Sequence, residues 1–90
     1  MLRLDVSDNA RRFIARRQLK HQRQIVAKIQ DLRDDPRPVD SKVLKGTSRG
    51  FRRADIGEYR IVYRVEDETL YVFDVGKRND DAVYRQFRRR

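Results

Sequence analysis

The alternation of apolar and polar positions is clearest between Gly57 and Val75. Apolar residues recur there at every second position, while Arg60 and Arg64 fall between them; the apolar members are Tyr59, Ile61, Tyr63 and Val65. A period of two with β-branched and aromatic residues predicts a strand. Polar residues 66–69 predict a turn, and residues 70–75 predict a returning strand. The segment therefore predicts an antiparallel hairpin.

Upstream of the hairpin, the pattern changes from strand to helix. Residues 2–6 alternate and predict a short strand, after which Ser7 or Asp8 can cap a helix. Apolar stripes at residues 10–14 and 25–32 predict two helices that break near Lys20 and His21. One long bent helix remains the alternative, because the break contains neither glycine nor proline. Two prolines after Asp34 end the second helical pattern.

The remaining segments complete an α+β prediction. Residues 39–50 predict a loop, residues 51–56 a strand, and residues 79–87 a short final helix. The chain is then a single domain, residues 1–90, with an N-terminal strand and a helical hairpin on one face of a mostly antiparallel four-stranded sheet. No predicted element covers the second face, which would carry Arg60.

Composition adds a strong positive charge to this picture. The 90 residues contain 23 Lys and Arg against 14 Asp and Glu, a formal net charge of +9. This balance favours a polyanionic partner, either nucleic acid or an acidic protein, over a merely solubilising surface. The absence of cysteine excludes disulfides and thiolate metal sites, and fits a cytoplasmic protein. No apolar run has membrane-spanning length, and no charged-then-apolar leader opens the chain.

The hairpin can bring Arg60, Arg78 and Tyr84 to one place, with Lys77 nearby. Guanidinium groups present planar donor forks to phosphate oxygens, and an exposed aromatic ring can stack on a base. These residues therefore suit a phosphodiester. The structural alternatives are a solvated Arg60 paired with Glu58 or Asp74, a loop charge at Arg78, and a core position for Tyr84.

A basic run precedes the hairpin. Its cations are Lys42, Lys45, Arg49, Arg52 and Arg53. They are either solvated loop charges or contacts to an RNA backbone. The single histidine, His21, lies between the predicted helices and is assigned a structural role. No metal triad, phosphate-binding glycine loop or Ser-His-Asp set is present in the sequence.

The order and spacing of several motifs resemble the RelE/ParE toxin superfamily, and its RelE branch in particular. The motifs that carry the resemblance are Gly57–Tyr63, Val75–Arg78, Val83–Tyr84, Leu44–Gly46 and Phe51–Arg52. The resemblance covers nearly the whole chain. It implies the toxin of a type II toxin–antitoxin system, with a cognate acidic antitoxin, the 70S ribosome and mRNA as partners.

For a RelE-like toxin, the resemblance implies metal-independent, cofactor-free cleavage of mRNA in the ribosomal A site. The 2′-hydroxyl would attack the adjacent phosphorus; Arg60 and Arg78 would stabilise the phosphate charge, and Tyr84 would orient the nucleotide. Arg52 stands where RelE has a lysine and would hold the backbone, so the general base is left open between Tyr84 and a ribosomal group. The alternatives are a ParE-like inhibitor of DNA gyrase and a catalytically silent basic binding module.

Overall fold

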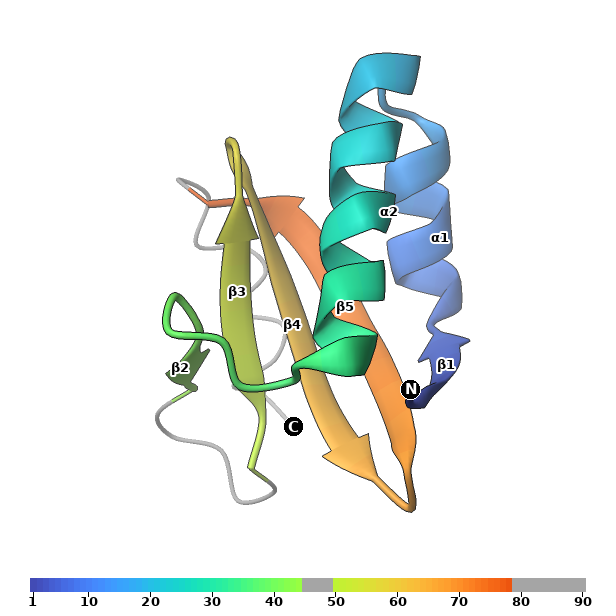
Figure 1. Cartoon of the computed structure of the whole chain (residues 1–90). Coiled ribbons are helices and arrows are strands. Elements are labelled where there is room, and N and C mark those ends of the chain that lie inside the picture. Colours follow the sequence, from blue (N-terminus) through green and yellow to red (C-terminus); the bar gives the residue numbers. More distant parts are fainter. Residues whose placement is uncertain (45–49, 79–90) are drawn as a thin grey trace.

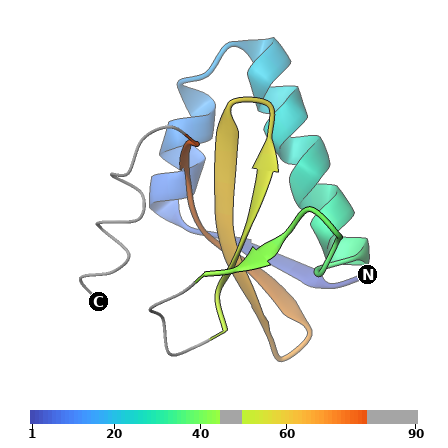
Figure 2. The ribbon, with the colours of Figure 1, turned by 90° about the vertical axis from the view of Figure 1, so that its left-hand side faces the viewer.

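The chain folds into one mixed sheet with a pair of helices on one side of it (Figures 1 and 2). The computed structural model describes residues 1–44 and 50–78. The sheet order is β1-β5-β4-β3-β2, in which β1 runs parallel to β5 and the other neighbours are antiparallel. In chain order the elements are β1 (Arg3–Val6), α1 (Asp8–Ala15), α2 (Leu19–Asp34), β2 (Lys42–Val43), β3 (Arg52–Ile56), β4 (Tyr59–Glu66) and β5 (Thr69–Lys77).

Two side chains define the helical hairpin. Ser7 caps α1, because its Oγ accepts the backbone N–H of Ala10 at 3.1 Å. The break between the helices lies at Arg16–Gln18, earlier than the sequence predicts, and the bent single helix is wrong. Gln22 accounts for a break without glycine or proline: its Nε2 donates to the carbonyls of Ala15 (3.2 Å) and Arg17 (3.0 Å) that the helix end leaves unpaired.

The predicted hairpin of β4 and β5 is confirmed, and both its own turn and the turn that precedes it use left-handed backbone. Gly57 has φ +57° in the two-residue turn that joins β3 to β4. The turn between β4 and β5 places Asp67 (φ 51°) and Glu68 (φ 59°) in the same region without any glycine. Positive φ at both central residues, as in the β4–β5 turn, is typical of a type I′ turn, whereas a glycine with positive φ at the first central residue, as at Gly57, is typical of a type II′ turn. Both turn types match the twist of a two-residue hairpin.

The main core lies between the helices and the sheet. Residues from both helices, such as Ala10 of α1 and Ile25 of α2, pack with the alternating side chains Tyr59, Ile61 and Tyr63 of β4. A smaller apolar cluster forms on the second face of the sheet, where Val62 is completely buried; its other members are Leu44, Phe51 and the partly buried Phe73. The second face is therefore not bare at its centre, in contrast to the prediction.

Two further differences from the predicted architecture concern the strands. The sheet has five strands, not four, because Lys42 and Val43 pair with β3; two residues are too few to leave an alternating pattern. Strand β5 continues to Lys77, past residue 75, where the predicted strand ends. The predicted helix at residues 79–87 lies outside the described residues. Neither described helix is long and apolar enough to cross a bilayer.

Candidate functional site

An ion pair between β3 and β4 lies on the second face of the sheet, next to the β3–β4 turn. The two-residue turn at Gly57 sets the β3–β4 register, which places Asp55 directly opposite Arg60. The Arg60 guanidinium donates from Nε to Oδ1 at 2.6 Å and from Nη2 to Oδ2 at 3.1 Å. Both side chains are mostly buried, with 15% of Arg60 and 26% of Asp55 exposed. This two-point geometry fixes the orientation of the guanidinium plane.

Two more arginines surround the same carboxylate. The Arg53 Nη1 lies 3.8 Å from Asp55 Oδ2. Arg78 follows β5 and is tied to the β3–β4 turn: its backbone N–H donates to the Glu58 carbonyl at 2.9 Å, and its Nη1 donates to the Gly57 carbonyl at 3.3 Å. Arg53, Arg60, Arg78 and Asp55 form what we call the arginine cluster, whose formal charge is three positive minus one negative, or +2.

The arginines of the cluster change the pKa of the Asp55 carboxylate. The hydrogen bond from Arg60 lowers the pKa of Asp55 below its ordinary value of 3.8. Burial acts in the opposite direction, and the charges of Arg60, Arg53 and Arg78 add to the lowering. Asp55 is therefore ionised at neutral pH, where it offsets part of the repulsion among the arginines.

An apolar surface adjoins the arginine cluster. Phe51 and Phe73 meet edge to face with ring centroids 5.3 Å apart, above the buried Val62. The Arg64 guanidinium lies 5.5 Å from the Phe51 ring centroid and is ion-paired with Glu66. A register shift between Val62 and Tyr63 inserts one extra residue in β5 at this point. The second face thus combines aromatic rings with fixed positive charges, a combination used to bind single-stranded nucleic acid.

The family assignment follows from comparison with known proteins. A family model described as "ParE toxin of type II toxin-antitoxin system, parDE" matches residues 5–82. This chain belongs to that family. No curated protein sequence matches the toxin.

Several solved structures that are similar to this toxin are RelE proteins. The intact RelBE toxin–antitoxin complex of E. coli matches with a TM-score of 0.74 and 25% identity, over 86% of this toxin and 96% of that chain. The RelBE2 complex of Mycobacterium tuberculosis matches with a TM-score of 0.72 and 26% identity, over 86% and 98%. The isolated E. coli RelE toxin matches with a TM-score of 0.74 and 24% identity, over 97% and 95%. The predicted RelE-like α+β fold is confirmed.

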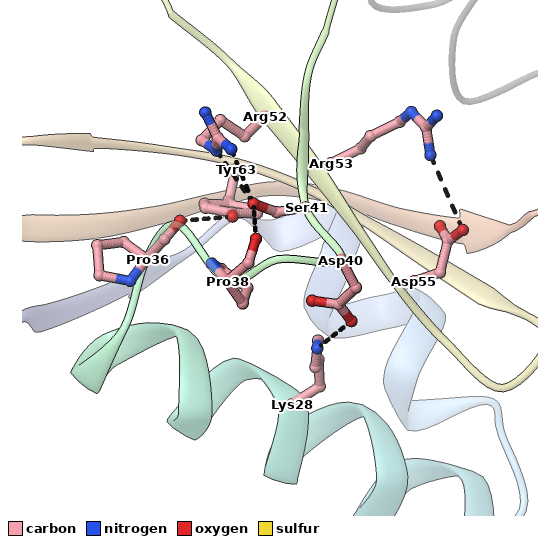
Figure 3. A network of polar contacts seen from close by, with 9 residues as sticks. All are labelled: Lys28, Pro36, Pro38, Asp40, Ser41, Arg52, Arg53, Asp55 and Tyr63. Carbon is pink, nitrogen blue, oxygen red and sulfur yellow. Dashed lines mark hydrogen bonds and ion pairs between the residues drawn. The ribbon is translucent and has the colours of Figure 1, made fainter.

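The structure brings Arg60 and Arg78 together as predicted, but it separates Arg52 from them. Arg52 pairs with Tyr63, a core residue of the helix-covered face, so its side chain leaves β3 on the opposite side from Arg53. Its guanidinium donates to Ser41 Oγ from Nη2 at 2.9 Å and from Nε at 3.3 Å. Figure 3 shows Arg52 directed at Ser41 and Arg53 directed at Asp55.

The other predicted residues take different positions. Lys42 is exposed and pairs with Arg53, which places it on the face of the arginine cluster. Lys77 is exposed but pairs with Tyr59, so it lies toward the helix-covered face. Lys45, Arg49 and Tyr84 lie outside the described residues.

Sequence reasoning missed Asp55 as the partner of Arg60 and considered Glu58 or Asp74 in its place. The missing signal was the turn length: if Ile56 and Tyr59 close a two-residue turn, Asp55 must face Arg60. The same parity places Arg53 and Asp55 on the second face of the sheet and Arg52 on the helix-covered face. Within residues 1–44 and 50–78, no group of three or more His, Asp or Glu side chains is arranged to hold a metal ion.

Proposed function

We propose that this toxin is a ribosome-dependent endoribonuclease that cleaves mRNA by internal phosphoryl transfer. The observation that carries the proposal is the convergence of Arg53, Arg60 and Arg78 on one face of the sheet. In the reaction the 2′-oxygen bonds to the adjacent phosphorus and the bond from phosphorus to the 5′-oxygen breaks. The 2′-hydroxyl loses its proton and the leaving 5′-oxygen gains one, which gives a 2′,3′-cyclic phosphate and a 5′-hydroxyl.

The arginines contribute by electrostatic stabilisation. Negative charge accumulates on the non-bridging oxygens as the phosphorus becomes five-coordinate, and oriented donors lower the barrier most where charge develops. We assign this role to Arg60, whose plane Asp55 fixes, and to Arg78, which the turn carbonyls hold in place. Arg53 shares their face and is assigned to the RNA backbone, together with the exposed Lys42.

Proton transfer needs a group outside the arginine cluster. Asp55 is a weak base, because the arginines hold its pKa below the ordinary value of 3.8, far from neutral pH. Arg52 stays protonated as an arginine, and its guanidinium donates to Ser41 Oγ. Its predicted role at the phosphate therefore rests on the resemblance alone. Tyr84 remains the candidate for orienting the nucleotide, and either Tyr84 or a ribosomal group would accept the proton.

The proposed partners follow from the family and the charge. Toxins of type II systems are held by antitoxins, and two of the similar structures are toxin–antitoxin complexes. The net charge of +9 favours an acidic antitoxin segment. Cleavage of ribosome-bound mRNA would place the toxin in the cytoplasm.

A second candidate is inhibition of DNA gyrase, because the matching family model takes its name from ParE. The two activities separate in parallel assays of the purified toxin: cleavage of mRNA on programmed ribosomes and supercoiling by DNA gyrase. The nuclease proposal predicts cleaved mRNA with a 2′,3′-cyclic phosphate and unaffected supercoiling. Blocked supercoiling without mRNA cleavage would support the gyrase alternative and reject the nuclease.

A further inference from the structure

The helical hairpin carries most of the excess positive charge of the toxin. Residues 9–30 contain seven Lys and Arg residues and no Asp or Glu. Asp8 stands just before this stretch and Asp31 just after it. The stretch therefore contributes a formal +7 to a chain whose total is +9. The proposed nuclease chemistry uses none of these cations.

Five of these cations lie on the surface that faces away from the sheet. Helix periodicity separates them from Ala10 and Ile25, which point into the core. We call this set the outer hairpin face; its members, all exposed, are Arg11, Arg12, Arg16, Lys20 and Arg23. Among the described residues, no ion pair involves any of the five. Arg12 is held instead by Asn9, to whose Oδ1 it donates at 2.7 Å.

The remaining two cations of the stretch are occupied within the fold. Lys28 pairs with Asp40 at 2.7 Å, and this pair ties α2 to the loop before β2 (Figure 3). Arg17 stacks on Phe13, with its guanidinium carbon 4.2 Å from the ring centroid, and donates from Nε to the Phe13 carbonyl. The fold thus employs two cations of the stretch and leaves five without a carboxylate partner in the described part of the chain.

We propose that the outer hairpin face binds the phosphate backbone of folded RNA, as a second RNA surface separate from the arginine cluster. The inference rests on the proposed function, because a toxin that cleaves ribosome-held mRNA must dock against folded RNA. A row of arginines without interspersed carboxylates matches the uniform negative charge of an RNA backbone. Double-stranded RNA is bound mainly through such phosphate and 2′-hydroxyl contacts.

A membrane fits this surface less well. Only two larger aliphatic side chains are well exposed on the described helices, Leu19 at 60% and Val26 at 45%. An interfacial helix needs a wide apolar face for the acyl chains, and here the apolar faces of α1 and α2 are packed against the sheet.

Both basic surfaces reach the same end of the molecule. Figure 1 shows the α1–α2 connection at the same end as the β3–β4 turn. His21 of α2 contacts the β3–β4 turn at this end. Its Nδ1 shares a hydrogen bond with the Tyr59 hydroxyl and lies 3.8 Å from Glu58 Oε1. Arg78 binds the carbonyls of the same turn. A folded RNA that surrounds this end could contact the outer hairpin face while a single strand reaches the arginine cluster.

The test compares two double variants that each remove two positive charges. Lys20→Ala with Arg23→Ala alters the outer hairpin face, whereas Arg3→Ala with Arg37→Ala removes two exposed cations elsewhere. The probe is a short RNA duplex without a cleavable single strand. Its dissociation constant is measured at several salt concentrations between about 50 and 200 mM, because proteins with many phosphate contacts lose about 10³- to 10⁵-fold in affinity over this range. We expect the hairpin double variant to bind more weakly, with a salt slope lower by about two, since each cation that binds a phosphate adds about one to the slope. The control double variant should keep the wild-type slope.

Three results overturn the inference. Equal reductions of affinity in both double variants mean that only net charge matters. Unchanged duplex binding by the hairpin variant means that the surface does not bind RNA. Weaker binding to polyglutamate, with duplex binding intact, means that the surface serves an acidic protein. Failure of the proposed function is distinguishable, because it appears as absence of mRNA cleavage by the wild-type toxin, whereas duplex binding is measured without cleavage.

Discussion

Replacing Asp55 by Asn tests whether the carboxylate holds the arginine cluster together. Asparagine keeps the shape of the side chain but removes its charge, so Arg60 loses a two-point ionic interaction and Arg53 loses its counter-charge. Hydrogen bonds to charged groups contribute about 1.5–3 kcal/mol each. With 26% of Asp55 exposed, solvent screening reduces this, and we expect the free energy of unfolding at pH 7 to fall by about 1–2 kcal/mol.

The lowered pKa of Asp55 also predicts how its contribution to stability changes with pH. The folded-state pKa of Asp55 is lowered, so its contribution is fully present above the ordinary pKa of 3.8 and is lost as pH falls through the folded pKa. The stability difference between wild type and Asp55→Asn should therefore be constant near neutral pH and shrink below pH 3.8. Urea unfolding at a series of pH values measures it.

Asp40→Asn is the matched control, because it makes the same chemical change at a pair that is more open to solvent. Asp40 contacts Lys28 at 2.7 Å with 54% of its side chain exposed, and such pairs contribute about 0.2–1 kcal/mol. Equal effects of the two substitutions at neutral pH would refute the reasoning. So would an Asp55→Asn effect that stays undiminished down to about pH 2, well below the ordinary range of Asp pKa values.

Three other predictions concern the loop, the turn and the proton. Tyr63→Phe removes the buried hydroxyl that donates to the Pro36 carbonyl at 2.6 Å, so unfolding free energy should fall by about 1–2 kcal/mol; an unchanged urea midpoint would contradict this. Glu68→Gly relieves a side chain at φ 59° and should raise the melting temperature, with a gain of about 1 kcal/mol; a lower melting temperature would show that the turn is not strained. Tyr84→Phe should slow cleavage and remove the alkaline part of the pH–rate profile; a full rate with the wild-type profile would leave Tyr84 only a stacking role.

The hairpin of β4 and β5 was predictable because burial on one face leaves a period of two in the sequence. Tyr59, Ile61 and Tyr63 carry that period, and their burial under the helices confirms it. The Ser7 cap was predictable for a similar reason, since a local hydrogen bond determines which residue types fit the position. Both features depend on residues close together in the chain.

Features set by long-range or side-chain contacts were not predictable. Strand β2 exists only through its pairing with β3, and the early break between the helices depends on one side chain, Gln22. The face of Arg52 depended on the turn length, because a change of one residue in register exchanges the two faces of β3. The residue types of the candidate site could thus be predicted, but not the pairing of Arg60 with Asp55.

The central claim, that the arginine cluster stabilises a cleaving phosphodiester, is tested most directly by single-turnover cleavage of ribosome-bound mRNA. We expect Arg60→Ala and Arg78→Ala each to reduce the rate by about 10²- to 10³-fold, the usual cost of removing an oriented transition-state donor. Arg37→Ala is the control, because it removes an exposed arginine outside the arginine cluster, and it should stay within a few-fold of wild type. Near-wild-type rates for both cluster variants, with folding checked by urea unfolding, would contradict the account.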